Sequence, residues 1–277
     1  MKPQILIVFA LSVFLVAGCQ LDDNEIVTDA KGLLKRVDDE KGETIAEYTY
    51  QRNGTLITSK EFNDFYSPGK HAEFKYTFDN EGRLTAKNGF EPGNMVMSSM
   101  TGAMDKYVTI GYEYDSENRI SRIHSSYHYD ELPDIDYETN LAFEYPDHRM
   151  VRTSFNHIRA EANTIISSTD YLFDKNGNIE ELISYYSENN VKRITYKETY
   201  TYDDQNKPFD FNPGPQSVNN VLSKMMTAYN YDDKGTQSVA YESEYTYEYT
   251  YYRNGYPKSV AEIWPNEMVN TKYFYYK

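Results

Sequence analysis

The chain has little of what a disulfide-stapled, nucleic-acid-binding or helical membrane protein needs. Its 277 residues include a single cysteine, Cys19, so no intrachain disulfide can form. Basic residues are outnumbered, 28 Lys and Arg against 43 Asp and Glu, and the net charge of −15 argues against binding to nucleic acid. The long apolar run from Ile5 to Ala17 is too short to span a bilayer as a mature helix.

The sequence also lacks the common signatures of catalysis. It contains no Gly-x-Ser-x-Gly, no His-Glu-x-x-His, no phosphate-binding glycine loop and no Cys/His pair. Asp and Glu are frequent enough to supply a carboxylate pair of the glycosidase type, but no pair stands out. We therefore expect no enzymatic activity and no cofactor. A carbohydrate-active hydrolase that uses such a pair is the alternative.

What the chain has in abundance is tyrosine, 29 residues of it, arranged in a repeat. Aromatic residues occur in pairs two positions apart, with polar residues between them, about every 30 residues. Residues two apart share one face of a strand, so each pair marks a strand with an aromatic face and a polar face. The aromatics that directly precede each turn are Tyr50, Phe78, Tyr114, Tyr145, Phe173, Tyr202, Tyr231 and Tyr251.

Most aromatic pairs are followed by a turn of constant chemistry. Asp commonly stands first, as Asp79 does, and Gly or Asn stands at the place where a positive φ is required. This is the sequence of a type I turn closed by a G1 bulge. An aliphatic residue such as Leu84 then returns the chain to the aromatic face. The predicted structural turn residues are Gly54, Gly82, Asn118, Gly177, Asn206, Gly235 and Gly255.

Residues 76–84 read Tyr-Thr-Phe-Asp-Asn-Glu-Gly-Arg-Leu and resemble the Tyr-Asp (YD) repeat of RHS-type proteins, roughly Tyr-x-Tyr-Asp-x-x-Gly-Arg-Leu. Residues 112–120 and 171–179 follow the same pattern closely. Together with its N-terminus, the mature chain is similar to a domain-of-unknown-function family of surface lipoproteins from Bacteroidota-type bacteria. That resemblance implies a porin-like β fold and brings no catalytic residues.

The N-terminus predicts export and lipidation. A basic residue followed by an apolar run is typical of a secretory signal peptide, here residues 1–18. Val16-Ala17-Gly18-Cys19 resembles the lipobox of bacterial lipoproteins, which implies a lipid on Cys19 that binds the membrane. Gln20 stands where an inner-membrane retention signal has Asp, and Asp22-Asp23 resembles the export signal of surface-exposed lipoproteins. We expect a tether over residues 19–30 and a location on the outer membrane, facing the cell surface.

Residues 31–277 carry the repeat without a Pro/Ser-rich linker and are predicted to form one domain. The hairpins give about 16–18 strands in a single antiparallel, all-β meander, which is long for an open sheet. We expect the sheet to curl into a flattened or plugged barrel that covers its aromatic face. The repeated turns are expected at one end of the sheet and the variable connections, among them about 212–228, at the other.

The later repeats are less regular. Pro208, Gln237 and Pro257 stand where earlier repeats have an aliphatic residue, so the last hairpins are expected to be looser or to lie at an edge. A short helix is predicted at Val218–Met226.

The strand faces argue against a membrane-spanning barrel. A band that faces lipid needs aliphatic residues, whereas one face here is charged and the other is dominated by tyrosine. The chain without residues 1–19 is therefore expected to fold and stay soluble without detergent. The charged positions are Glu47, Lys75, Glu113, Glu144 and Glu248.

Binding is the function that this composition favours, with a purely structural shell as a further alternative. Tyr127, Tyr129 and Tyr137 lie outside the repeat positions and are the candidate contacts for a glycan or protein ligand, because tyrosine offers an apolar ring and a polar hydroxyl. His124, His128 and Asp130 are candidate metal ligands, and the acidic stretch from Asp130 to Glu138 is a candidate calcium site. A solvated surface is favoured for both.

Overall fold

The computed structural model of the protein describes residues 33–62, 70–93, 104–129, 137–158, 165–188, 191–208, 214–232 and 234–276. The regular elements in these ranges are all β-strands, and no helix that is long and apolar enough to cross a membrane occurs there. The strands are β1 (Leu34–Asp38), β2 (Thr44–Tyr50), β3 (Leu56–Glu61), β4 (Ala72–Phe78), β5 (Leu84–Glu91), β6 (Lys106–Tyr114), β7 (Ile120–His128), β8 (Tyr137–Asp147), β9 (Met150–Ile158), β10 (Ile165–Phe173), β11 (Ile179–Glu188), β12 (Val191–Tyr202), β13 (Val221–Tyr231), β14 (Gln237–Tyr251), β15 (Pro257–Ile263) and β16 (Val269–Tyr276).

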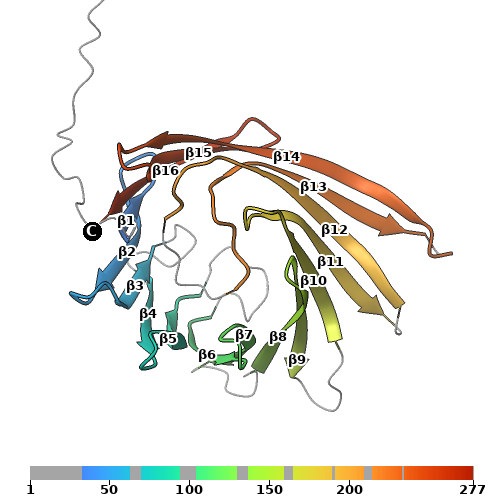
Figure 1. Ribbon diagram of the computed structural model, residues 1–277, viewed down its shortest axis with the longest axis horizontal. Helices are drawn as coiled ribbons and strands as arrows, with labels where there is room; N and C mark the ends of the chain where they lie inside the picture. The colour runs from blue at the N-terminus through green and yellow to red at the C-terminus, as the bar shows by residue number, and fades with distance from the viewer. Residues whose placement is uncertain are drawn as a thin grey trace, which may run out of the picture.

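These strands form one closed barrel (Figure 1). Each strand pairs antiparallel with its neighbours in the sequence, and β1 closes the sheet by pairing with β16, where Val37 lies opposite Phe274. The predicted all-β meander that curls into a barrel is confirmed. Closure also explains how so long a meander avoids two exposed edge strands.

The regular turns have the geometry that their residues predict. Gly82 has a φ of 81°, and its N–H donates to the carbonyl of Asp79 at 3.1 Å. The carboxylate of Asp79 accepts the N–H of Arg83 and that of Glu81, both at 2.9 Å, and the bond from Arg83 is the main cause of its lowered pKa. After the turn, Leu84 is buried and pairs with Phe78, at a point where the register of the two strands shifts by one residue. Positive φ also occurs at Gly42, Gly54, Asn118, Gly177, Gly235, Gly255 and Glu267.

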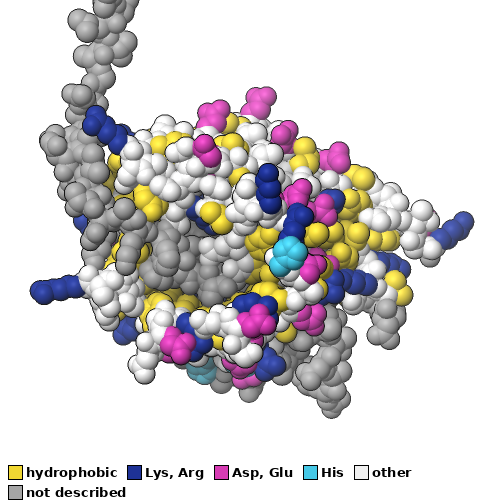
Figure 2. All heavy atoms as spheres, viewed as in Figure 1, with side chains coloured by type: hydrophobic (Ala, Val, Ile, Leu, Met, Phe, Trp, Pro, Cys, Tyr) yellow, Lys and Arg dark blue, Asp and Glu magenta, His cyan; other side chains and the backbone are white. Residues whose placement is uncertain are grey.

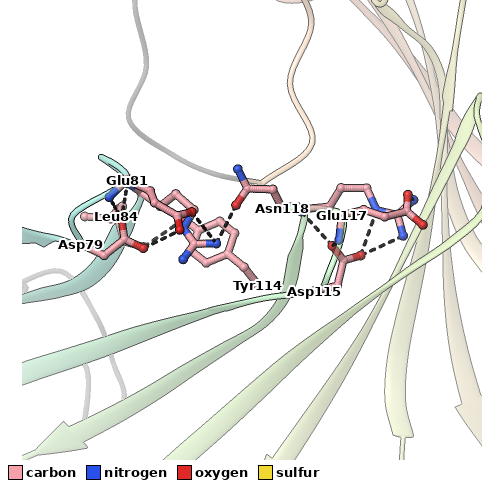
Figure 3. Close-up of polar contacts among 9 residues, drawn as sticks. Asp79, Glu81, Leu84, Tyr114, Asp115, Glu117 and Asn118 are labelled. Carbon is pink, nitrogen blue, oxygen red and sulfur yellow. Dashed lines mark hydrogen bonds and ion pairs between the residues drawn. The ribbon is translucent and has the colours of Figure 1, made fainter.

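Neighbouring hairpins are joined by the tyrosine that precedes each turn. The hydroxyl of Tyr114 donates to the carbonyl of Leu84 in the preceding hairpin at 2.9 Å. Arg83 contacts the next hairpin in turn. Its guanidinium lies 5.0 Å from the centroid of the Tyr114 ring and donates to the side-chain oxygen of Asn118 at 2.6 Å (Figure 3). These bonds explain why tyrosine is frequent at this place of the repeat. The hydroxyl bond recurs from Tyr50 to Leu34, Tyr145 to Ile120, Tyr202 to Ile179 and Tyr276 to Pro257.

Asn206 is the predicted turn residue that does not take up a positive φ. Its N–H donates to the carbonyl of Gly255 in another hairpin at 3.2 Å instead of closing a turn on Asp203. The reason is an insertion: the chain runs from Asp203 to Asn220 before β13 begins, where other hairpins turn within a few residues. We call the described part of this stretch, residues 203–208 and 214–220, the inserted segment.

The insertion corrects three further predictions. The helix expected at Val218–Met226 is not formed, because β13 occupies Val221–Tyr231. Successive turns of an antiparallel meander alternate between its ends, so the inserted segment lies with the repeated turns and not with the variable connections. The strand β13 separates the inserted segment from the turn at Gly235, and crossing one strand leads from one end of the barrel to the other. The Gly235 turn therefore lies at the opposite end from the other repeated turns.

The aromatic face lines the inside of the barrel, and the polar face is outside. Ala72, Phe74 and Val108 form a buried core cluster on neighbouring strands β4 to β6. Figure 2 shows hydrophobic side chains gathered around the interior, with acidic side chains projecting from the upper rim. The outward, exposed positions include Glu47, Lys75, Glu113, Glu144 and Glu248.

Candidate functional site

The three tyrosines predicted to bind a ligand do come together, near the end of β7 and the start of β8. The rings of Tyr127 and Tyr137 stack with centroids 4.5 Å apart, and Tyr129 lies 6.4 Å from Tyr137. Burial, and then the charge of Tyr129, raise the pKa of Tyr137 to about 12. Tyr129 is only 2% exposed and Tyr127 packs against the core cluster, so this group contributes mainly to packing. A ligand contact at Tyr127, Tyr129 and Tyr137 stays a prediction.

The candidate metal ligands do not assemble into a site in the described part of the chain. A ring nitrogen of His124 lies 2.8 Å from Asn140, and the other lies 3.3 Å from Ser126. No group of three or more His, Cys, Asp or Glu side chains within the described ranges is placed to hold a metal ion. Asp130, the acidic stretch up to Asp136 and Cys19 lie outside the described residues.

The inserted segment forms a better-defined site, because both of its ends are fixed to the barrel. It runs from the wall toward the interior between β12 and β13 (Figure 1). The carboxylate of Asp203 accepts the backbone N–H of Asn220 at 3.1 Å, its side-chain N–H at 3.0 Å, and the hydroxyl of Tyr251 on β14. Asn178 and Asn219 exchange two further bonds at 3.1 and 2.9 Å. Asn178 and Asn220 are buried, so water does not compete strongly for these bonds.

A closed ring of three hydrogen bonds holds the inserted segment at Ser217, near its C-terminal end. The hydroxyl of Ser217 donates to the hydroxyl of Tyr202 at 2.7 Å. Tyr202 donates to the carbonyl of Ile179 at 2.7 Å, and the N–H of Ile179 donates back to Ser217 at 3.0 Å. Every donor in the ring has an acceptor, which favours one fixed position for the segment.

A pocket of about 460 Å³ lies between the inserted segment and the inner wall. Proline and aromatic rings supply its apolar surface, while tyrosine hydroxyls, side-chain amides and one ammonium group supply polar atoms. Such a mixture in a preformed hollow of this size is typical of a small-molecule site. The lining residues are Ile179, Tyr200, Tyr202, Lys207, Pro208, Pro215, Gln216, Ser217, Asn219, Asn220, Val221, Tyr249, Pro257 and Phe274.

Tyr200 connects this pocket with a row of charged residues on the inner wall. Its hydroxyl donates to Glu198, and the carboxylate of Glu198 lies 3.8 Å from the ammonium of Lys224. Lys224 in turn lies 4.5 Å from the centroid of the Tyr245 ring. Burial, followed by the bond to Glu198, raises the pKa of Tyr200, so its hydroxyl stays protonated at neutral pH.

A second pair of an acid and a tyrosine joins β14 to β15. The hydroxyl of Tyr247 donates to Glu262 at 3.4 Å, and burial followed by the charge of Glu262 raises the pKa of Tyr247 to about 12. The ring of Tyr245 packs edge-on against Trp264 at 6.2 Å. We call the inner face of β12 to β15 the tyrosine wall; its members are Glu198, Tyr200, Lys224, Tyr245, Tyr247, Tyr249 and Glu262.

The tyrosine wall is suited to holding a ligand by its faces and hydroxyls. Protonated phenols both donate and accept hydrogen bonds, and their rings offer flat apolar surface. Glu198 and Glu262 each already accept a tyrosine hydroxyl.

Sequence reasoning did not find this pocket. Tyr200, Tyr202 and Tyr249 occupy regular repeat positions, and the pattern that placed them on the barrel wall could not show what covers them. Pro208 did break the repeat. That break indicated an irregular hairpin, but not that the inserted segment turns inward.

No protein-family model matches the sequence, and no curated protein matches it either. Among solved structures, a porin-like protein from Bacteroides vulgatus is 10% identical, with 88% of this chain and 98% of that chain covered and a TM-score of 0.50. A porin-like protein from Bacteroides uniformis is 11% identical over 88% of this chain and 96% of that one, with a TM-score of 0.37. The TcdB2-TccC3 toxin structure is 17% identical over 82% of this chain and 9% of that one, with a TM-score of 0.29.

The first of these likenesses defines the class of the fold. Coverage of nearly the whole of both chains at a TM-score of 0.50 shows that the protein has a porin-like β-barrel fold. At 10% identity the likeness concerns the fold alone. Function has to be argued from the site.

Proposed function

We propose that the protein is a lipid-anchored binding module at the outer-membrane surface that holds a carbohydrate in the pocket between the inserted segment and the tyrosine wall. The observation that carries this proposal is the pocket itself, about 460 Å³ in volume and lined by tyrosines, prolines and amides. Its covering segment is fixed at both ends by buried hydrogen bonds, so little ordering is needed when a ligand binds.

The chemistry of the lining favours a sugar over an extended apolar ligand. Tyr200, Tyr202 and Tyr249 present phenol rings with hydroxyl groups, and burial raises the pKa of all three. Neutral hydroxyls match the donors and acceptors of a sugar, and the ring faces match its C–H surface. Gln216 and Lys207 on the inserted segment add polar groups that can select among sugars.

The outer wall supports a barrel that lies beside the membrane rather than within it. Exposed charged residues such as Lys75 and Glu113 occupy outward positions of β4 and β6. A lysine on the lipid side costs about 2–4 kcal/mol near the midplane. Attachment through a lipid on Cys19 is consistent with a polar outer wall. The chain without residues 1–19 should therefore fold and stay soluble without detergent, and folding only in micelles would contradict this.

Binding to a glycan array, followed by titration calorimetry of the best ligands, tests the proposed site. Tyr249→Phe removes one hydroxyl from the pocket and Lys207→Ala removes its ammonium group; each should weaken binding about tenfold. Tyr107→Ala is the control, because this tyrosine is 50% exposed and lies outside the pocket. If neither pocket variant changes affinity, or no glycan binds, the proposal is wrong.

Two further outcomes of the same experiment separate the alternatives. Loss of binding in Tyr127→Ala, with no change in Tyr249→Phe, would move the site to the stacked tyrosines that the sequence singled out. Release of reducing ends from a bound polysaccharide would establish a hydrolase, and binding to neither glycan nor protein would favour a structural shell.

A further inference from the structure

Apart from its tyrosines, the pocket between the inserted segment and the tyrosine wall is lined by a single ionisable group. That group is the ammonium of Lys207, and no Asp or Glu of the described chain belongs to the lining. The chain as a whole has 43 acidic residues against 28 basic ones. The pocket therefore differs in charge from the rest of the molecule, and a cation without an acid beside it favours a ligand with a negative charge.

The charge of Lys207 is not compensated within the protein. The residue is half-buried, and its ammonium makes no ion pair or hydrogen bond within the described part of the chain. Lys224 on the wall differs, because the carboxylate of Glu198 lies 3.8 Å from its ammonium. A neutral ligand that displaces water from Lys207 leaves this charge without a partner, which costs free energy, whereas a carboxylate replaces the water with an ion pair.

The hydroxyl of Tyr249 is a second donor in the lining with no hydrogen-bond partner among the described residues. Burial is the main cause that raises its pKa, so the hydroxyl stays protonated at neutral pH and can donate. The other tyrosine hydroxyls of the lining are already used, because Tyr200 donates to Glu198 and Tyr202 donates to a backbone carbonyl. The phenol of Tyr249 therefore remains available to a ligand.

Both donors are held by fixed parts of the barrel, one on the inserted segment and one on the wall. Asn206 directly precedes Lys207, and its backbone N–H donates to the carbonyl of Gly255 in another hairpin at 3.2 Å. On the wall, the ring of Tyr249 stacks with that of Tyr251 on the same strand, with centroids 5.8 Å apart. A ligand group bound by both donors would be held from the two sides of the pocket with little reordering.

Two carboxylates lie near this part of the wall, but both are engaged by other donors. The charges of Asp203 and Glu262 contribute, after burial, to the raised pKa of Tyr249. Asp203 accepts the backbone N–H and the side-chain N–H of Asn220 at 3.1 and 3.0 Å. Glu262 accepts the hydroxyl of Tyr247 at 3.4 Å. The acids near the pocket are thus partnered parts of the wall, whereas the unpartnered charge in its lining is positive.

We infer that the sugar held in this pocket is a uronic acid, whose carboxylate is bound by Lys207 from the inserted segment and by Tyr249 from the wall. This inference rests on the proposed function, because it takes the ligand to be a carbohydrate. The ammonium and the phenol can each donate to one of the two oxygens of a carboxylate. The neighbouring tyrosine rings then cover the C–H faces of the sugar.

Oligosaccharides that differ only in their carboxyl groups test the inference. Oligogalacturonate, hyaluronan fragments and alginate fragments are titrated into the full chain by calorimetry, each beside its methyl ester, which has the same backbone without the charge. The protein should bind at least one acid about tenfold more tightly than its ester. Lys207→Gln should abolish that preference, and Lys207→Arg should keep part of it. Lys234→Gln is the control, because it removes the same charge from an exposed turn at the opposite end of the barrel.

A double-variant cycle tests whether the two donors bind one carboxylate. Lys207→Gln and Tyr249→Phe should each weaken binding of the acid about tenfold. The double variant should lose clearly less than the product of the two losses, because each single change already loosens the group that the other donor holds. Losses that simply multiply would overturn the shared carboxylate.

The remaining outcomes separate this inference from the proposed function. Equal affinity for acids and esters, weakened by Tyr249→Phe, would overturn the uronic acid and leave the carbohydrate site standing. A preference that survives Lys207→Gln, or that Lys234→Gln removes equally, would do the same. Tighter, Lys207-dependent binding of sulfated sugars would replace the carboxylate with a sulfate ester. Binding to no carbohydrate, on the array or in solution, would overturn both proposals.

Discussion

The strands β1–β8 and the strands β12–β14 follow the same repeat but place different chemistry inside the barrel. The buried hydrophobic residues lie on β1–β8 or directly after one of these strands, as Tyr129 does after β7. Among the described residues, Pro257 and Val260 on β15 are the exceptions. On the inner face of β12–β14, Glu198, Lys224 and tyrosine hydroxyls take their place. The repeat thus determines how strands pair, while the inward residues decide whether a wall is sealed by packing or kept open for a ligand.

The largest expected effect tests how tightly the first region is packed. A Cβ on Gly89 of β5 would lie 2.1 Å from the carbonyl oxygen of Glu73 and 2.6 Å from a ring carbon of Phe74. A backbone atom cannot move aside as a side chain can, so Gly89→Ala should lower the free energy of unfolding by about 3 kcal/mol. Urea unfolding of the chain from residue 20 onward measures this.

Two matched variants make the result specific. Gly111 has no atom within 4 Å of a Cβ position and an ordinary φ, so Gly111→Ala should be neutral or add about 0.5 kcal/mol. Ala240→Val adds more volume on β14, at an exposed position, and should change stability by less than about 0.5 kcal/mol. A small loss of stability in Gly89→Ala, or a large loss in Ala240→Val, would mean that the two regions are packed equally tightly.

The next effect concerns the turns that both regions share. Gly82 has a φ of 81° with open space around it, so substitution there meets backbone strain and no clash. Gly82→Val should cost about 1–3 kcal/mol, because a β-branched residue is disfavoured at positive φ. Gly82→Asn should cost much less, since Asn118 holds the same place in the next hairpin at a φ of 68°. Equal melting temperatures for the two variants would contradict this geometry.

The turns also show how far the sequence could predict the structure. Period-2 alternation and the Asp-x-x-Gly turns, as at Asp79 to Gly82, report local backbone geometry, and geometry repeated along a chain gives the meander and its closure. The inserted segment obeys no period. Its position depends on Asp203 meeting Tyr251 and on Asn219 meeting Asn178, partners in other hairpins that no local pattern encodes. The pocket follows from that irregularity.

A smaller effect is expected when a tyrosine hydroxyl is removed from each of the two regions. Tyr114→Phe removes the 2.9 Å bond to the carbonyl of Leu84 and should cost about 1 kcal/mol of stability while leaving glycan binding unchanged. Tyr251→Phe removes the bond that fixes Asp203 at the base of the inserted segment. It should cost a similar amount and also weaken binding. Calorimetry alongside thermal melts checks both, and unchanged affinity in Tyr251→Phe would show that the pocket does not depend on this anchor.

The smallest effect contrasts two asparagines that the repeat places in equivalent positions. Asn118 has a φ of 68°, whereas Asn206 is not in the left-handed region and instead donates from its side chain to the carbonyl of Asn254 at 2.9 Å. Asn118→Ala should therefore cost about 1 kcal/mol, because alanine is strained at positive φ, and Asn118→Gly should recover most of it.

At Asn206 the order of the two substitutions should reverse. Asn206→Ala loses one exposed hydrogen bond, at a cost of about 0.5 kcal/mol. Asn206→Gly loses the same bond and also raises the conformational entropy of the unfolded chain, which lowers stability further. Glycine should thus be better than alanine at residue 118 and worse at residue 206. Differential scanning calorimetry of the four variants measures whether the order of glycine and alanine reverses between the two sites. The same order at both sites would mean that the hairpin between β12 and β13 turns like the others, and that the inserted segment is not what sets this region apart.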